Sequence, residues 1–163
     1  MSMNSVAELV ILLAEPSDVQ RKIVERHLAD EGVSQISGFA TLAEVMAELQ
    51  QHKPDVLISA LHFADGTGLD LLQQLRADPQ LADLPFMLMS SETRKAQLEQ
   101  FKQSGVCAIL PKPFNKLHLG KALNAALDLL TPQELQLDLY DITDVRVLIV
   151  DDSRLARNHI RRV

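Results

Sequence analysis

Four residues of this chain stand where predicted buried strands end, and their types could do chemistry together. Glu15 follows one apolar run, Ser90 and Ala60 close two others, and Lys112 follows a fourth. The carboxyl ends of parallel strands meet at one edge of a sheet, so we expect these residues to face one crevice. There a carboxylate, a hydroxyl and an ammonium group could form an ion pair, ligate a cation through the carboxylate or hold a small ligand.

The other reactive side chains follow no spacing that is typical of a catalytic or metal site. Cys107 is the only cysteine and is most simply a small buried apolar residue. His62 lies two positions after Ala60, beside the expected crevice, where an imidazole could titrate near neutral pH. With no phosphate-binding glycine loop, nucleophile elbow or Cys/His cluster in the sequence, we expect no enzyme and no histidine-bound metal. The histidines are His27, His52, His62, His118 and His159.

Five segments that would position these residues carry the pattern of strands. Most are nearly continuous apolar runs, which is typical of strands buried on both faces of a sheet. The second segment is the weakest signal, because its apolar residues alternate with small and polar ones. The five predicted strands are Leu9–Ala14, Gln35–Phe39, Val56–Ala60, Phe86–Ser90 and Val106–Leu110.

Apolar residues at helical spacing separate these strands. Ser17, a Thr41–Glu44 capping box and Asn115 mark helix starts, and Gly32 marks a helix end. The predicted apolar faces consist of Val19, Ile23, Val24 and Leu28; of Leu42, Val45, Met46 and Leu49; of Leu69, Leu71, Leu72 and Leu75; of Ala96, Leu98 and Phe101; and of Leu119, Ala122, Leu123, Ala126, Leu127 and Leu130. Strands and helices therefore alternate five times. This order predicts an α/β fold, a doubly wound five-stranded parallel sheet with helices on both faces, followed by a C-terminal extension.

Length, composition and charge limit the setting in which such a fold acts. The 163 residues, 47% of them hydrophobic, suit one globular domain with some chain left over. Apolar runs fall far short of the roughly 18 to 20 residues of a membrane span. A single cysteine and the lack of a secretory signal indicate a reducing, cytoplasmic setting. The net charge of −6 argues against direct binding to nucleic acid.

Several segments stand in an order that points to a family. They are Ser17–Val24, Pro54–Ala60 with Gly68–Leu72 downstream, Pro85–Glu92 and Leu110–Phe114. In this order they resemble the receiver domain of response regulators in two-component signalling, a CheY-like and flavodoxin-like fold, over about residues 7–130. The resemblance implies a site where two acidic residues help to hold Mg²⁺ and an aspartate accepts phosphate from a histidine kinase. A Thr or Ser and a Lys-Pro pair complete the family's set.

Position by position, the resemblance indicates a degenerate site. Glu15 stands where the first acidic residue is expected, Pro16 replaces the second, and Ala60 occupies the phosphoacceptor position. Ser90 and Lys112 match the pattern. A methyl group supplies neither a nucleophile nor a metal ligand. We therefore expect no phosphorylation at position 60 and weak or absent Mg²⁺ binding, through Glu15 at most.

Two further expectations concern the surroundings of this site. Ile109 stands where many relatives carry an aromatic switch residue, and Lys112–Pro113 resembles a family loop that holds a cis peptide bond. Without a metal, Lys112 keeps only Glu15 as an anionic partner, which predicts a structural ion pair between the two.

Two rival interpretations stay open at this point. One is a working phosphoreceiver with an unusual acceptor, Asp65 or Asp70, although Asp65 fits a turn and Asp70 the first turn of a helix. The other is a sensor in which the vacated crevice holds a small ligand in place of phosphate.

The end of the chain repeats its beginning. After a predicted short helix and linker over residues 131–144, residues 145–163 repeat the first strand and the start of the first helix. Asp151 and Asp152 give this copy the acidic pair that the first copy lacks. We expect a longer protein with tandem receivers, the first degenerate and the second able to take phosphate. The repeated apolar strand should pair or pack with another copy of the chain, or dock on its own receiver.

Together these features predict a non-catalytic receiver that acts as a regulatory interaction or dimerisation module, with no cofactor. Self-association would use the last two helices and the fifth strand, the surface that the family uses for pairing, or an exchange of tails. The expected partners are the second receiver, an output domain and a histidine kinase. We expect neither nucleic-acid nor membrane binding.

Overall fold

The structure, a computed structural model, describes residues 5–92 and 94–131, and strands and helices alternate along this part of the chain. The strands are β1 (Val10–Ala14), β2 (Gln35–Phe39), β3 (Val56–Ala60), β4 (His62–Phe63), β5 (Gly66–Thr67), β6 (Phe86–Ser90) and β7 (Ala108–Pro111). The helices are α1 (Asp18–Asp30), α2 (Leu42–Gln51), α3 (Gly68–Ala77), α4 (Lys95–Gln103) and α5 (Lys116–Leu130), preceded by a 3-10 turn, η1 (Val6–Glu8).

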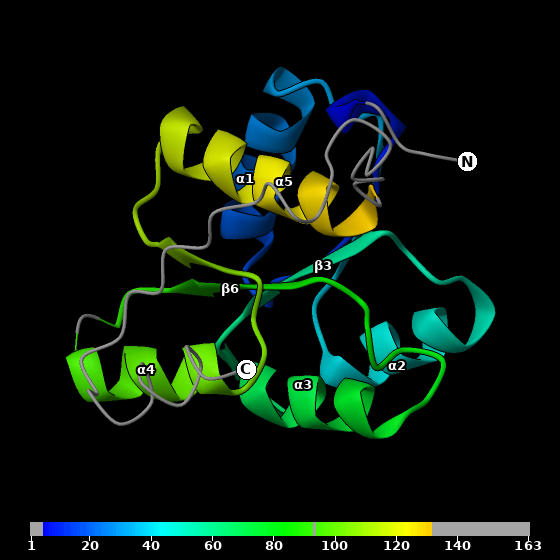
Figure 1. Ribbon diagram of the computed structural model, residues 1–163, viewed down its shortest axis with the longest axis vertical. Coiled ribbons are helices and arrows are strands. Elements are labelled where there is room, and N and C mark those ends of the chain that lie inside the picture. Colours follow the sequence, from blue (N-terminus) through cyan, green and yellow to red (C-terminus); the bar gives the residue numbers. More distant parts are fainter. Residues whose placement is uncertain (1–4, 93, 132–163) are drawn as a thin grey trace, which may run out of the picture. The chain divides into compact units, whose positions relative to one another are not determined.

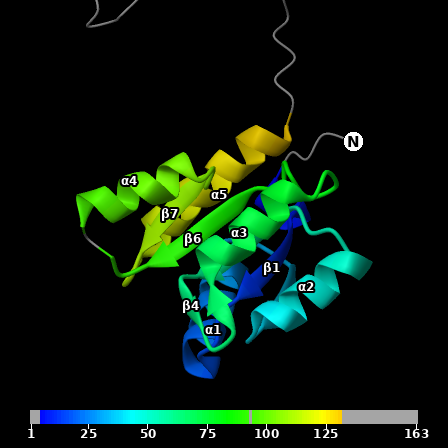
Figure 2. The ribbon, with the colours of Figure 1, turned by 90° about the horizontal axis from the view of Figure 1, so that it is seen from below.

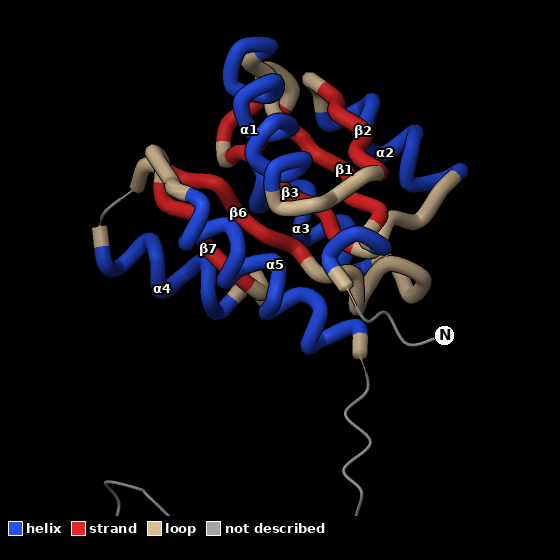
Figure 3. Tube along the Cα trace, turned by 90° about the horizontal axis from the view of Figure 1, so that it is seen from above, coloured by secondary structure: helices blue, strands red, loops and turns tan. Residues whose placement is uncertain are grey.

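The main sheet confirms the predicted doubly wound α/β fold. Its five strands are parallel and lie in the order β2-β1-β3-β6-β7. Helices α1 and α5 cover one face, and α2, α3 and α4 cover the other (Figures 1 and 2). Figure 3 shows these layers from the side of α1 and α5. The strand order reverses between β1 and β3, which is where sheets of this kind place their functional crevice.

The sheet separates two layers of apolar side chains. Along β1, Ile11 and Leu13 pack with α1 and α5, whereas Leu12 and Ala14 pack with α2, α3 and α4. This alternation follows from the two-residue period of a strand. Because helices cover both faces, every residue of β3 and β6 is buried. Each large apolar side chain buried in this way stabilises the fold by about 1.5 to 3 kcal/mol.

The predicted helix starts at Ser17, Thr41 and Asn115 are confirmed. In each case the side-chain oxygen accepts a hydrogen bond from the backbone N–H three residues further on. Gly32, the predicted stop of the first helix, follows the end of α1 with a φ of +100°, a conformation that favours glycine.

The predicted capping box at Thr41 is wrong in one respect. The Glu44 carboxylate accepts a hydrogen bond from the backbone N–H of Ala40 rather than from that of Thr41, so the box is not reciprocal. A reciprocal box occurs instead at the start of α3. There Thr67 accepts from the Asp70 backbone N–H, and the Asp70 carboxylate accepts from that of Thr67.

The predicted apolar face of the first helix is partly wrong. Val24 and Leu28 are buried, but Val19 and Ile23 are 68% and 42% exposed. At 3.6 residues per turn, Val24 and Leu28 lie about 140° around the helix from Val19 and Ile23. Because α1 contacts the sheet on one side only, it cannot bury both pairs.

The fifth strand of the sheet is also displaced from its predicted position. β7 begins at Ala108, opposite Met87 of β6, rather than at Val106, and it extends to Pro111. Cys107 therefore precedes the strand and is half-buried, not fully buried as expected. Its partial burial raises the pKa of the Cys107 thiol.

Some expectations fall outside the described residues. These are the linker after Thr131, the repeat over residues 145–163, and the acidic pair Asp151 and Asp152. Within residues 5–92 and 94–131, no helix is both long enough and apolar enough to cross a bilayer.

Candidate functional site

The ends of four strands bring the expected site residues together. Glu15 follows β1, Ala60 ends β3, Ser90 ends β6 and Lys112 follows β7. All four line one crevice of about 270 Å³. Its remaining wall consists of Leu61, His62, Met89, Ser91 and Glu92.

The expected ion pair between Glu15 and Lys112 is present. The Lys112 Nζ donates to Glu15 Oε2 over 2.9 Å. The Glu15 side chain is only 4% exposed, and that of Lys112 is 28% exposed. The free energy lost when both charges leave water offsets much of the free energy gained from their attraction. The main effect of Lys112 is therefore to compensate the charge of a carboxylate that would otherwise be buried alone. It also joins β1 to β7 across the two strands that separate them in the sheet.

Further hydrogen bonds hold Glu15 in place. Its Oε1 accepts from the Ser17 backbone N–H over 3.1 Å, and its carbonyl oxygen accepts from Arg21 Nη1 over 2.9 Å. Its backbone N–H donates to the carbonyl of Phe39 in β2 over 3.0 Å. Both carboxylate oxygens of Glu15 are therefore already engaged. The bond from Arg21 was missed by the sequence analysis, because no local pattern links a side chain to a carbonyl six residues earlier.

Ala60 contributes a methyl group to the wall of the crevice, and its backbone carbonyl is closely surrounded. The buried Ser59 hydroxyl donates to the Ala60 carbonyl over 2.8 Å. Gly68 approaches the same carbonyl so closely that a Cβ there would lie 2.4 Å from the oxygen. Only glycine allows this approach. Position 60 thus has a rigid backbone and a side chain without any polar atom.

Ser90 lies beside a carboxylate that the sequence analysis missed. Ser90 is buried, and its Oγ accepts from the Glu92 backbone N–H over 3.0 Å. The Glu92 carboxylate lines the crevice but accepts from Arg94 Nε and Nη2 over 2.9 Å each. This contact raises the pKa of Arg94. The signal that could have revealed Glu92 is its place two residues after a strand end.

Two of the expected site positions do not face the crevice. Pro16 is exposed and is not part of the crevice wall. Ile109, the expected switch position, is partly buried and lines a separate groove between β7 and α5. The peptide bond between Lys112 and Pro113 is cis, as expected from the resemblance.

The two aspartates considered as alternative acceptors also lie elsewhere. Asp65 and Asp70 line a groove between α2 and α3. The Asp65 carboxylate accepts from the backbone N–H groups of Leu42 and Ala43 over 3.1 and 3.0 Å. These bonds lower the pKa of Asp65. Both aspartates therefore cap helix starts, Asp65 at α2 and Asp70 at α3. Asp65 was missed as a cap, because its partners precede it by more than 20 residues.

Both carboxylates of the crevice are engaged in ion pairs with basic side chains. Of its two carboxylates, Glu15 is bound by Lys112 and Ser17, and Glu92 is bound by Arg94. Mg²⁺ demands a nearly octahedral shell of oxygen ligands. In the part of the chain that the structure describes, no group of three or more His, Cys, Asp or Glu side chains is placed to hold a metal ion.

Comparisons with a family model and with individual relatives point to the same family. The model of the response regulator receiver domain matches residues 11–124. The chain is 28% identical over 104 residues to the chemotaxis protein CheY of Pseudomonas aeruginosa, which covers 64% of this chain and 84% of that protein. It is 26% identical over 114 residues to the chemotaxis protein CheY-3 of Vibrio cholerae, which covers 70% of this chain and 88% of the relative.

Solved structures agree with the sequence comparisons. The chemotaxis response regulator CheY4 of Vibrio cholerae superimposes with a TM-score of 0.66 at 27% identity, over 72% of this chain and 98% of that chain. The signal receiver domain of a histidine kinase from Syntrophus aciditrophicus has a TM-score of 0.66 at 20% identity, over 87% of this chain and 99% of that chain. The second similarity concerns the fold alone.

Proposed function

The chain belongs to the response regulator receiver domain family, and we propose that it is a member that takes no phosphate at the usual position and acts as a regulatory interaction module. Receiver domains are signalling modules that interact with histidine kinases and other partners in two-component systems. The observation that carries the proposal is the methyl group of Ala60 at the end of β3.

The chemistry of phosphorylation explains why this methyl group matters. An acyl phosphate forms when a carboxylate oxygen attacks phosphorus and the donor group leaves. Ala60 has no side-chain lone pair with which to attack. The transfer also needs a cation that screens the charge of the phosphoryl group. Because Glu15 and Glu92 are both engaged in ion pairs, we infer that the crevice binds Mg²⁺ weakly or not at all.

The groove between β7 and α5 supports the interaction role. It has a volume of about 240 Å³ and combines small apolar side chains with two basic or titratable ones. We propose that the chain self-associates through this face and the neighbouring helices α4 and α5. The lining residues are Ala108, Ile109, Pro111, His118, Lys121, Ala122 and Ala125.

The repeat at residues 145–163 supports a tandem arrangement. In it, the degenerate receiver at residues 7–130 would position a second receiver that has the acidic pair Asp151 and Asp152. The second receiver would take phosphate from a histidine kinase and pass the signal to an output domain. The single cysteine supports a reducing, cytoplasmic setting.

A second candidate function is supported by the crevice itself. Its volume of about 270 Å³ is close to the lower limit for small-molecule sites, and Ser90 and Lys112 give it two polar groups that could orient a ligand. In this alternative the chain senses a small molecule in place of phosphate.

The experiment that tests the proposal is intact mass spectrometry of the chain after incubation with Mg²⁺ and acetyl phosphate. The natural chain should gain no phosphoryl group. A Pro16→Asp, Ala60→Asp double variant, which restores both carboxylates, should gain one. Pro16→Asp alone is the matched control, because it adds a carboxylate without an acceptor.

Phosphate on the natural chain would contradict the proposal. Peptide mapping would then distinguish Asp65 and Asp70 from the crevice as sites of attachment. The sensor alternative predicts instead that small-molecule binding changes the resonances of crevice residues in the natural chain and that Lys112→Met abolishes the change.

A further inference from the structure

We propose that the groove between α2 and α3 docks an amphipathic helix of a partner protein that carries a lysine or arginine at one end of its apolar stripe. The groove has a volume of about 620 Å³ and shares no residue with the crevice. The proposal therefore does not depend on whether position 60 takes phosphate.

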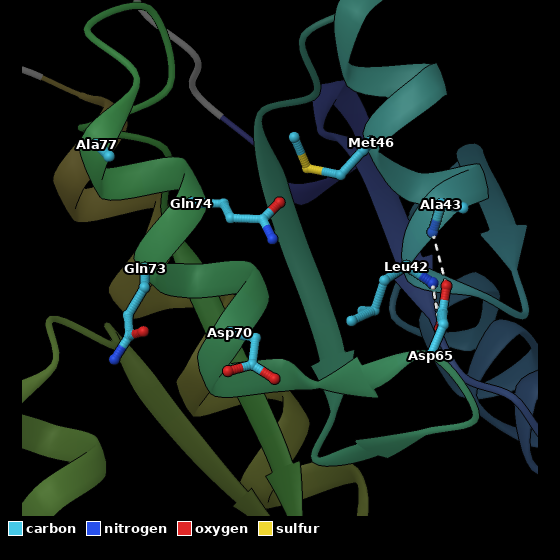
Figure 4. A pocket seen from close by; sticks show the side chains of 8 residues that line it. All are labelled: Leu42, Ala43, Met46, Asp65, Asp70, Gln73, Gln74 and Ala77. Atoms are coloured by element: carbon cyan, nitrogen blue, oxygen red, sulfur yellow. Dashed lines mark hydrogen bonds between the residues drawn. The ribbon is translucent and has the colours of Figure 1, made fainter.

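The groove is lined by apolar and uncharged side chains over most of its length. Leu42 and Met46 of α2 supply its larger apolar side chains, and Figure 4 shows Met46 and Gln74 pointing toward one another across the groove. The thioether of methionine adapts to different apolar partners. The amides of Gln73 and Gln74 on α3 can donate to and accept from an incoming chain. An apolar side chain of the partner would therefore insert between Met46 and Gln74.

One end of the groove is negatively charged. Asp65 and Asp70 lie there, near the β4-β5 hairpin (Figure 4). The starts of α2 and α3 at this end each contribute roughly half a positive charge, so the two carboxylates leave about one net negative charge. Backbone hydrogen bonds lower the pKa of Asp65, which keeps it ionised.

Basic side chains do not neutralise this end. The eight lining residues include two carboxylates and no lysine, arginine or histidine. Arg76, on α3, donates instead to the carbonyl oxygens of Leu84 and Gly105 over 2.9 and 3.0 Å. A cation on the partner would thus meet unneutralised carboxylates, each of which retains free lone pairs beside its backbone bonds.

The shape of the groove favours a helix over a small molecule or a strand. Ala43, Asp65, Asp70, Gln73, Gln74 and Ala77 are exposed, so the groove is open along its length and would leave a small ligand largely in water. The α3 wall from Asp70 to Ala77 spans about 10 Å, or two helical turns. Both walls are helices, which offer no free strand edge but can receive the side-chain ridge of a third helix.

The test uses the 163-residue chain and a synthetic helical peptide with a leucine stripe and two lysines at one end. Binding is followed by fluorescence anisotropy and by NMR shifts. The peptide should shift resonances of α2, α3 and the β4-β5 hairpin. Added salt should weaken the binding of the peptide, because it screens the attraction between opposite charges. Gln74→Arg fills the groove and pairs with Asp70 four residues earlier, so it should lower the affinity by about fivefold or more.

Two matched controls make the result specific. Gln103→Arg adds the same side chain to an exposed position of α4 and should leave the affinity unchanged. A peptide with glutamates in place of the lysines should bind at least about fivefold more weakly. Circular dichroism would verify that both variants keep the fold.

Three outcomes of the peptide experiments would overturn the proposal. They are equal binding of the glutamate peptide, equal binding by Gln74→Arg and the natural chain, and NMR shifts confined to β7 and α5. Sedimentation of the chain alone gives a further one: a dimer that Gln74→Arg disrupts would show that the groove serves a second copy of the chain instead.

Discussion

Among the described residues, Glu15 is the only charged residue that is buried, and the fold depends on how its charge is compensated. Removing the partner of a fully buried charge costs about 3 to 5 kcal/mol. Because Lys112 is 28% exposed, Lys112→Met should lower the free energy of unfolding by a smaller amount, about 2 kcal/mol. Urea denaturation measures this difference.

A double-mutant cycle separates the ion pair from other effects of the substitution. The Glu15→Gln, Lys112→Met variant should recover part of the loss, because it leaves no charge uncompensated. Lys116→Met is the matched control, since Lys116 is largely exposed and lies 3.9 Å from Asp30. A coupling energy of zero, or an equal loss in the control, would contradict a structural role for the pair.

Asp65 gives the chain a pH dependence of predictable sign. The pKa of Asp65 is lower in the folded chain than the ordinary value of 3.8, because its carboxylate accepts hydrogen bonds from the backbone N–H groups of Leu42 and Ala43 at the start of α2. Such a carboxyl stabilises the fold above its unfolded pKa, and the contribution is lost as the pH falls through the folded pKa. Asp65→Asn should therefore lower the melting temperature at pH 7, and the difference should shrink as the pH falls below 3.8 and through the lower pKa of the folded chain.

Thermal melts of the two chains across this pH range provide the measurement. Asp78→Asn is the control, because Asp78 lies at the C-terminal end of α3, outside the groove, and its carboxylate accepts from the Gln80 backbone N–H in a turn and not from a helix start. A difference between Asp65→Asn and the natural chain that persists unchanged in acid would rule out this role of the Asp65 charge.

At the scale of elements, α5 depends on its capping residue. The Asn115 side chain accepts from the His118 backbone N–H over 3.0 Å and satisfies one of the unpaired donors at the helix start. Asn115→Ala should lower the free energy of unfolding by about 1 kcal/mol. Asn115→Ser should lower it much less, because a serine hydroxyl can also cap a helix start. Chemical denaturation distinguishes the two, and an equal loss in both variants would refute the capping role.

The order of elements could be predicted from the sequence because each signal was local. The apolar run Val56–Ala60 reflects a strand covered on both faces, and Asn115 caps a helix within three residues of itself. The errors arose where a neighbour decides the outcome. Val19 and Ile23 have helical spacing, but only the sheet determines which side of α1 is buried.

The candidate site also combines features that local sequence signals predict with contacts that distant segments determine. The carboxyl ends of parallel strands meet at one edge of a sheet, and this rule places Glu15, Ala60 and Lys112 in one crevice. Charge balance then predicts the ion pair between Glu15 and Lys112. The Asp65 cap joins segments that are distant in sequence and is set by packing alone. No pattern in a single sequence records such a contact.

At the scale of the whole molecule, two layers of helices fix four strand ends around the crevice. We therefore expect metal affinity at this crevice to depend on the side chains that line it. Restoring the two missing carboxylates should then restore a cation site on an otherwise unchanged scaffold.

In EDTA, the Pro16→Asp, Ala60→Asp variant should melt below the natural chain, because the carboxylate added at position 60 repels Glu15 across the crevice. Mg²⁺ should reverse this loss. A ligand at about 100 times its Kd stabilises a protein by roughly 2.7 kcal/mol, which for a domain of this size is a rise in Tm of about 5 to 10 °C. The natural chain should show no rise. Differential scanning fluorimetry with NaCl at matched ionic strength separates specific binding from screening, and a rise of equal size in the natural chain would mean that Glu15 and Glu92 exchange their basic partners for the metal.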